Sequence, residues 1–156
     1  MAQFILTGLT AAESAVVCHW AYGAGCGPYD LSPADTEAIL LPDLRYYAVR
    51  QDGRLAGLAC FGEDARVFGG PYGQPALDVG CALDPALVGQ GRGRPFATAV
   101  VDFAARTYRA NQLRLSVALA NQRAIRVFEA IGFVPRRRFA GITRGGIHPF
   151  LVMTRG

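Results

Sequence analysis

Apolar and polar residues recur at regular spacing along most of the chain, and this spacing predicts its secondary structure. Segments in which the two kinds alternate predict strands, whereas apolar residues three or four positions apart predict helices. The predicted strands span residues 4–6, 46–50, 55–61, 77–83, 114–118, 133–139 and 150–153. The predicted helices span residues 11–22, 95–109 and 122–131, with a further helix beginning near Ser32.

Local signals mark where these elements begin and turn. Thr10, with Glu13 three residues later, forms a capping box for the first helix. Asp52-Gly53 predicts a tight hairpin between two strands, and Asn121 suits the N-cap of the last helix. Antiparallel strands come first, and a strand–loop–helix–strand–helix–strand order follows. This order predicts an α/β domain with one mixed sheet and helices on both faces.

Composition places the chain among globular proteins. It has 156 residues, of which 51% are apolar and 18% charged, so we expect a single domain over 1–156. The N-terminus lacks the basic region of a signal peptide, and no apolar run approaches the ~20 residues of a membrane span. The four cysteines have neither paired spacing nor the spacing of zinc ligands. We therefore expect a reducing, cytoplasmic location and no metal site.

The basic residues are unusual because all 16 of them are arginine. This bias reflects either a GC-rich, bacterial genome or the recognition of phosphate groups. The net charge of +4 is modest and most arginines are scattered, so no nucleic-acid partner is expected. Arg136-Arg137-Arg138 is the one tight run, and it either decorates a solvated strand end or borders an anionic cofactor.

The loop between the fourth predicted strand and the third predicted helix carries the strongest candidate chemistry. It contains three alternating glycines, Gly89, Gly91 and Gly93. Glycine lets backbone N–H groups turn inward and a helix N-terminus is partly positive, so together they can hold a diphosphate. Arg92 and Arg94 can add charge-assisted bonds. A Walker loop is excluded because no Gly-Lys-Ser/Thr follows, and the spacing disfavours a dinucleotide fingerprint, which leaves an ordinary glycine turn as the alternative.

Two motifs in a fixed order extend this observation. The chain reads Leu83-Asp-Pro before Gly89-Gln-Gly-Arg-Gly, and later Asn121-Gln-Arg-Ala-Ile-Arg-Val-Phe128-Glu-Ala-Ile-Gly-Phe. With these motifs the chain resembles the GNAT superfamily of N-acetyltransferases over essentially its whole length. It departs from the family pattern at Val88, where Arg or Gln is usual, and at Arg92, where an aliphatic residue is usual. The main departure is Phe128, because many members carry tyrosine there.

The resemblance implies a mostly antiparallel central sheet of about six to seven strands with about four flanking helices. It also implies acetyl-CoA as cofactor and direct attack of a primary amine of a small molecule or a protein on the thioester, with a homodimer as the default assembly. The implied cofactor-binding residues are Leu83, Gly89, Gln90, Gly91, Arg92, Gly93, Arg94, Asn121 and Phe128. The backbone at Leu83 has the implied catalytic role of binding the oxyanion. The acceptor pocket is expected to contain Trp20, Tyr22, Tyr29 and Asp30.

The proton transfers of such a reaction need further groups. Asp78, an acid inside an apolar strand, is the candidate catalytic base, and the alternative is an exposed strand edge. Weaker candidates are Glu63, Asp64 and His148. Phe128 has no hydroxyl with which to protonate a leaving thiolate, which leaves water or one of three tyrosines: Tyr22, Tyr29 and Tyr108. A very slow enzyme, or a non-catalytic acyl-CoA sensor, is therefore the alternative function.

Overall fold

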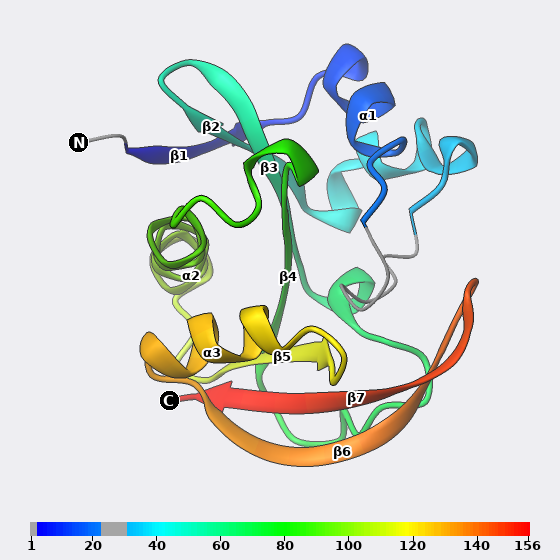
Figure 1. The fold of residues 1–156 in the computed structure, drawn as a ribbon, viewed down its shortest axis with the longest axis vertical. Helices are drawn as coiled ribbons and strands as arrows, with labels where there is room; N and C mark the ends of the chain where they lie inside the picture. Colours follow the sequence, from blue (N-terminus) through cyan, green and yellow to red (C-terminus); the bar gives the residue numbers. More distant parts are fainter. Residues whose placement is uncertain (1–2, 23–30) are drawn as a thin grey trace.

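The computed structural model describes residues 3–22 and 31–156. Seven strands form one sheet in the order β1-β2-β3-β4-β5-β7-β6 (Figure 1). Neighbouring strands are antiparallel except β4 and β5, which run parallel, so the mixed and mostly antiparallel sheet is confirmed. The strands are β1 (Phe4–Gly8), β2 (Tyr46–Gln51), β3 (Arg54–Phe61), β4 (Leu77–Leu83), β5 (Leu113–Ala118), β6 (Val134–Thr143) and β7 (Gly146–Arg155).

Helices cover both faces of the sheet. In the described ranges the α-helices are α1 (Ala11–Val17), α2 (Gly93–Tyr108) and α3 (Gln122–Ala130). Single 3₁₀ turns are η1 (Pro33–Asp35), η2 (Ala38–Leu40), η3 (Pro42–Leu44), η4 (Glu63–Ala65) and η5 (Pro85–Leu87). Figure 1 shows α2 and α3 on one side of β4 and α1 on the other. None of these helices is long and apolar enough to cross a membrane.

Some element boundaries differ from the predictions. The first helix ends at Val17 rather than 22, because the N–H groups of His19 and Trp20 bond three residues back and tighten the chain into a turn. The helix expected near Ser32 is replaced by three short 3₁₀ turns, which prolines interrupt. Strands β6 and β7 are longer than expected, since Pro149 masks the strand pattern yet pairs with Ala140.

Two apolar clusters hold the layers together. The larger lies between the sheet and the helices α2 and α3, and its fully buried members include Val100, Val101 and Met153. Each such side chain contributes roughly 1.5–3 kcal/mol to stability. Gly57 of β3 fixes where α2 begins, because a Cβ at this position would overlap the ring of Phe96. The smaller cluster joins α1 and η2 to the opposite face of β3.

Strands β4 and β5 pair over only two residues. Leu77 pairs with Leu113 and Asp78 pairs with Arg114. The described residues form no further pairs between β4 and β5. On its other side, β4 forms hydrogen-bonded pairs with β3 at alternate residues, as shown by the bond from Asp84 N to Ala56 O (2.8 Å). The intervening residues of an antiparallel strand point their N–H and C=O groups away from that partner. These groups of residues 79, 81 and 83 therefore face the diverging edge of β5.

Candidate functional site

The glycine loop connects β4 to α2 and has a well-defined backbone. Gly89 and Gly91 adopt φ angles of +82° and +76°, which residues with a side chain rarely adopt. The side-chain amide of Gln90 donates to the carbonyl oxygen of Ala86 at 2.8 Å and ties the loop to η5. Asp84 accepts the N–H of Ala86 at 2.9 Å and thereby caps η5. The sequence thus builds a fixed turn that leads directly into α2.

Four consecutive N–H groups lie open at the start of α2. The first helical bond runs from Phe96 N to Arg92 O (3.0 Å), so the N–H groups of Gly93 and Arg94 have no acceptor within the helix. No described residue accepts a hydrogen bond from the N–H of Gly91 or Arg92. A Cβ built on Gly91 would meet nothing within 4 Å. Open space, unpaired N–H groups and the dipole of a 16-residue helix together suit a diphosphate.

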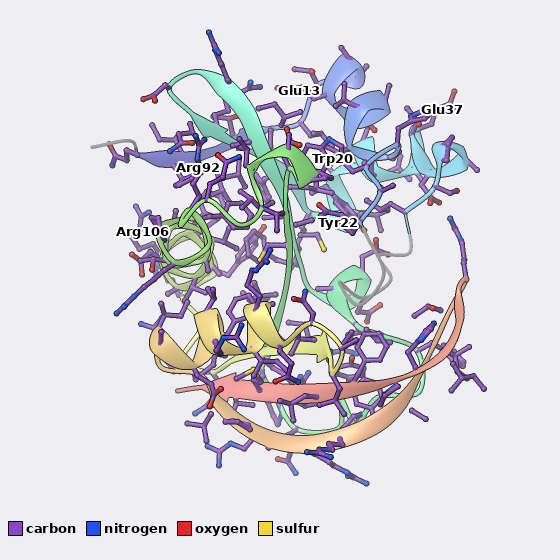
Figure 2. The ribbon with its side chains drawn as sticks, in the orientation of Figure 1. Glu13, Trp20, Tyr22, Glu37, Arg92 and Arg106 are labelled. Carbon is purple, nitrogen blue, oxygen red and sulfur yellow. The ribbon has the colours of Figure 1, made fainter. Side chains whose placement is uncertain are left out.

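The arginine side chains of the loop point elsewhere. Arg92 donates to Gln51 Oε1 at 2.7 Å, and Figure 2 shows it toward β1 and β2. Arg94 lines a groove between β1 and the outer face of α2. The guanidinium of Arg123 of α3 approaches the loop, because its Nη1 would be 3.6 Å from a Cβ on Gly89. The motifs gave Arg123 no function, and only the packing of α3 beside the loop reveals this proximity.

Helix α3 lies close to the loop for a structural reason. A Cβ on Gly93 would be 3.2 Å from Val127 Cγ2, so the missing side chain lets α2 and α3 approach. The side chain of Asn121 accepts the N–H of Ala124 at 3.2 Å, which confirms it as the helix cap. Phe128 is buried and its ring packs edge-on against Phe133 at 5.7 Å. The cofactor contacts of Asn121 and Phe128 remain predictions.

Asp78 does not lie on an exposed edge, and that alternative is wrong. Its side chain is 2% exposed, and its two oxygens accept bonds from Arg114 Nε (2.6 Å) and Nη2 (2.8 Å). Arg66 Nε adds a third bond at 2.8 Å. The hydrogen bonds to Asp78 raise the pKa of Arg114, in spite of its burial. Because both carboxylate oxygens already accept N–H groups from guanidinium ions, this geometry gives the proposed base function no support.

The end of β4 is contacted from the N-terminal segment. The hydroxyl of Tyr22 donates to the carbonyl oxygen of Leu83 at 2.6 Å, across 61 residues of sequence. This carbonyl is one of the groups that face away from β3. Trp20 packs against the smaller apolar cluster around α1 (Figure 2). Tyr29 and Asp30 lie outside the described residues.

Two other candidates for proton transfer, Tyr108 and His148, lie away from the glycine loop. Tyr108 bonds to Tyr47 at 2.8 Å at the end of α2, and a helix of 16 residues places it about 24 Å from the loop. The pKa of Tyr108 is raised to about 12, mainly because the hydroxyl is buried and secondly because it is hydrogen-bonded to Tyr47. His148 lies in β7, opposite Gly141 and close to the β6–β7 turn, and its ring contacts the carbonyl of Gly145. Neither group is near the loop.

Asp64 has the most suitable position of the candidate acids. It accepts a hydrogen bond from the hydroxyl of Tyr46, and burial raises the pKa of Tyr46 far above its usual range, so that this hydroxyl stays protonated. Tyr46 pairs with Cys60, and Cys60 pairs with Gly80 in the middle of β4. The neighbouring Ala65 would be 3.4 Å from a Cβ on Gly80, so η4 packs over this part of β4. Glu63 is exposed, and sequence patterns gave no signal for Tyr46.

The fold and the loop together define a coenzyme-binding α/β protein, with an N–H-lined helix start beside a parallel strand pair that separates. The chain belongs to the acetyltransferase (GNAT) family, because the model of that family matches residues 16–133. The resemblance found in the sequence is therefore confirmed. A search of curated proteins gives no match.

Solved structures of similar fold cover almost the whole chain. A chimera of the spermidine N-acetyltransferase SpeG from Vibrio cholerae and hSSAT has a TM-score of 0.72 and 16% identity, covering 98% of this chain and 95% of its own. AAC(6')-Ib in complex with ribostamycin and coenzyme A has a TM-score of 0.72 and 18% identity, with coverages of 98% and 93%. At such low identity these likenesses concern the fold.

Proposed function

We propose that this chain is one domain that transfers the acetyl group of acetyl-CoA to a primary amine of a small molecule or a protein. The observation that carries the proposal is the row of open N–H groups at 91–94, next to the unpaired edge of β4. The family supports the reaction type. The solved structures of AAC(6')-Ib with coenzyme A or acetyl-CoA, which share the fold, support the cofactor.

The residues present fit coenzyme A at two places. The N–H groups of residues 91–94 suit its diphosphate, and Arg123 adds a positive charge beside Gly89. The outward N–H and C=O groups of Cys81 suit an amide of its extended arm, which can pair with β4 as a further strand does. When bound, the cofactor supplies a thioester whose carbonyl carbon an amine can attack.

The chain must then move protons around β4. An amine with a pKa near 10.4 is neutral in only about one molecule in 2,500 at pH 7, so a proton acceptor is required. Asp64, held by Tyr46 beside Gly80, suits this function better than Asp78. The backbone N–H group of Leu83 can stabilise the developing oxyanion. Phe128 has no hydroxyl with which to protonate the leaving sulfur. We assign this step to the hydroxyl of Tyr22, which donates to the Leu83 carbonyl.

One observation favours a second candidate function, a domain that binds acyl-CoA without turnover. Phe128 is buried in the core and carries no hydroxyl. Loss of a general acid costs roughly 10²–10⁴ in rate. Incubation with acetyl-CoA and a panel of amines, including spermidine and ribostamycin, separates the two functions by following thiol release. Tight coenzyme A binding without release for any amine supports the non-catalytic function.

We call the open N–H groups of residues 91–94 the diphosphate cradle. The variant Gly91→Ala tests this cradle, with Gly53→Ala as a matched control. Both glycines have similar φ angles, +76° and +78°, and a Cβ on either meets nothing within 4 Å. Each substitution should therefore cost a similar 1–2 kcal/mol of backbone strain. Only Gly91→Ala should weaken coenzyme A binding in calorimetry, by at least about tenfold, because it disturbs N–H groups at the helix start. Equal binding by both variants, or no binding by the unaltered protein, contradicts the proposal.

A further inference from the structure

A second positively charged site lies on the other side of the α3 N-terminus. A cavity of about 370 Å³ opens there between α3 and the strands β6 and β7. Its apolar lining includes Leu119, Ile125 and Leu151, and three consecutive arginines, 136–138, border it. An apolar floor with a cationic border suits a ligand that joins a flat ring to an anionic group.

The backbone of β6 explains why an arginine reaches this cavity. The pairing of β6 with β7 shifts between Pro135 and Arg137, so that one extra residue forms a bulge. Beyond the bulge Arg138 lies directly opposite Leu151, and residues paired in this way share a face of the sheet. Leu151 belongs to the core beneath α3. Arg138 is therefore on the face that α3 covers.

Within residues 3–22 and 31–156 these charges have no partner of opposite sign. Arg136 donates to the hydroxyl of Thr154 at 2.8 Å, which is a neutral group. In the described part of the chain no carboxylate forms an ion pair with Arg136, Arg137 or Arg138. The cavity thus carries uncompensated positive charge, which attracts an anion.

The cavity and the diphosphate cradle are joined by one turn of helix. Gln122 of α3 lines the cavity, and the next residue, Arg123, approaches Gly89 of the loop. Two anion sites therefore flank the α3 N-terminus. Coenzyme A carries two separate phosphate groups, the diphosphate and a 3′-phosphate on its adenosine. We infer that the cavity holds the adenosine 3′-phosphate of coenzyme A and that Arg138 contacts this phosphate; the inference rests on the proposed function.

The test compares coenzyme A with dephospho-coenzyme A, which lacks only the 3′-phosphate. In calorimetry the unaltered protein should bind coenzyme A about 10–100-fold more tightly, as expected for a charge-assisted bond. Arg138→Gln should abolish this difference and leave the affinity for dephospho-coenzyme A unchanged. Arg109→Gln, which removes the same charge at the far end of α2, should preserve the difference.

Three outcomes overturn the inference and leave the proposed function standing. The first is equal binding of both compounds by the unaltered protein. The second is an equal loss of both affinities in Arg138→Gln, which indicates a general charge effect. The third is binding of adenosine 3′,5′-bisphosphate that coenzyme A does not displace, which indicates a separate nucleotide site. Failure of both coenzymes to bind refutes the proposed function itself, and the inference falls with it.

Discussion

The ion pair between Asp78 and Arg114 gives the sharpest prediction for stability. Asp78→Asn keeps the shape of the side chain but leaves Arg114, which is 3% exposed, without a counter-charge. Removing one partner of a buried pair costs about 3–5 kcal/mol. The asparagine oxygen still accepts one N–H, which returns about 1 kcal/mol. We therefore expect a net loss of about 2–4 kcal/mol from a domain whose total stability is typically about 5–15 kcal/mol.

Urea denaturation measures this loss as a lower midpoint with an unchanged slope. Asp43→Asn is the matched control, because Asp43 is exposed and its replacement should change stability by less than about 0.5 kcal/mol. The double variant Asp78→Leu/Arg114→Met removes both charges and should be more stable than the single variant, since apolar replacement of a buried pair is often neutral. A loss below about 1 kcal/mol for Asp78→Asn, or a double variant less stable than the single one, would refute the reasoning.

Two further predictions concern titratable groups. The hydrogen bond from Arg144 lowers the pKa of Asp35, so the pair stabilises the fold at neutral pH and loses this effect as the pH falls through the lowered pKa. In Arg144→Gln the free energy of unfolding should fall less steeply below about pH 4 than in the unaltered protein, as measured by urea denaturation at several pH values. The same pH dependence in both proteins contradicts a stabilising ion pair. Burial raises the pKa of Cys60 to about 12, so only about 10⁻⁴ of it is thiolate at pH 8. Peptide mapping after reaction with Ellman's reagent should find Cys60 modified only when the protein is unfolded, and rapid modification in the folded state contradicts its burial.

Local sequence was sufficient for the glycine loop. Positive φ angles at Gly89 and Gly91 are a property of single residues, and Pro85 marks the first residue of η5, although α2 begins at Gly93, two residues before the predicted start. The cradle could therefore be predicted before any contact was known. The order of the last strands did not follow from such local signals, because β5 and β6 are consecutive in the chain and yet β7 lies between them in the sheet.

Contacts between distant residues could not be predicted in this way. Asp78 meets Arg66 and Arg114, which are 12 and 36 positions away, so its apolar surroundings in sequence suggested a reactive acid instead of a buried ion pair. The direction of Arg92 toward Gln51 depends on the end of β2, which lies 41 residues earlier. Arg123 reaches the loop only because Gly93 permits close packing of α2 and α3. In each of these three cases the sequence left open where a charged side chain points.

The open edge of β4 explains why the proposed function places the reaction at this strand. Its backbone has one edge in the sheet with β3 and one edge open beyond Asp78, so it can bind a coenzyme arm without losing a strand partner. On one face of this strand lies the core beneath α2, and on the other Gly80 presents no side chain toward η4. In the proposed reaction an amine approaches over Gly80, on the side of Asp64 and Tyr46, and the diphosphate binds at the far end of the strand. The proposal therefore places acceptor and cofactor on either side of one strand, so that the reacting atoms meet where that strand is unpaired.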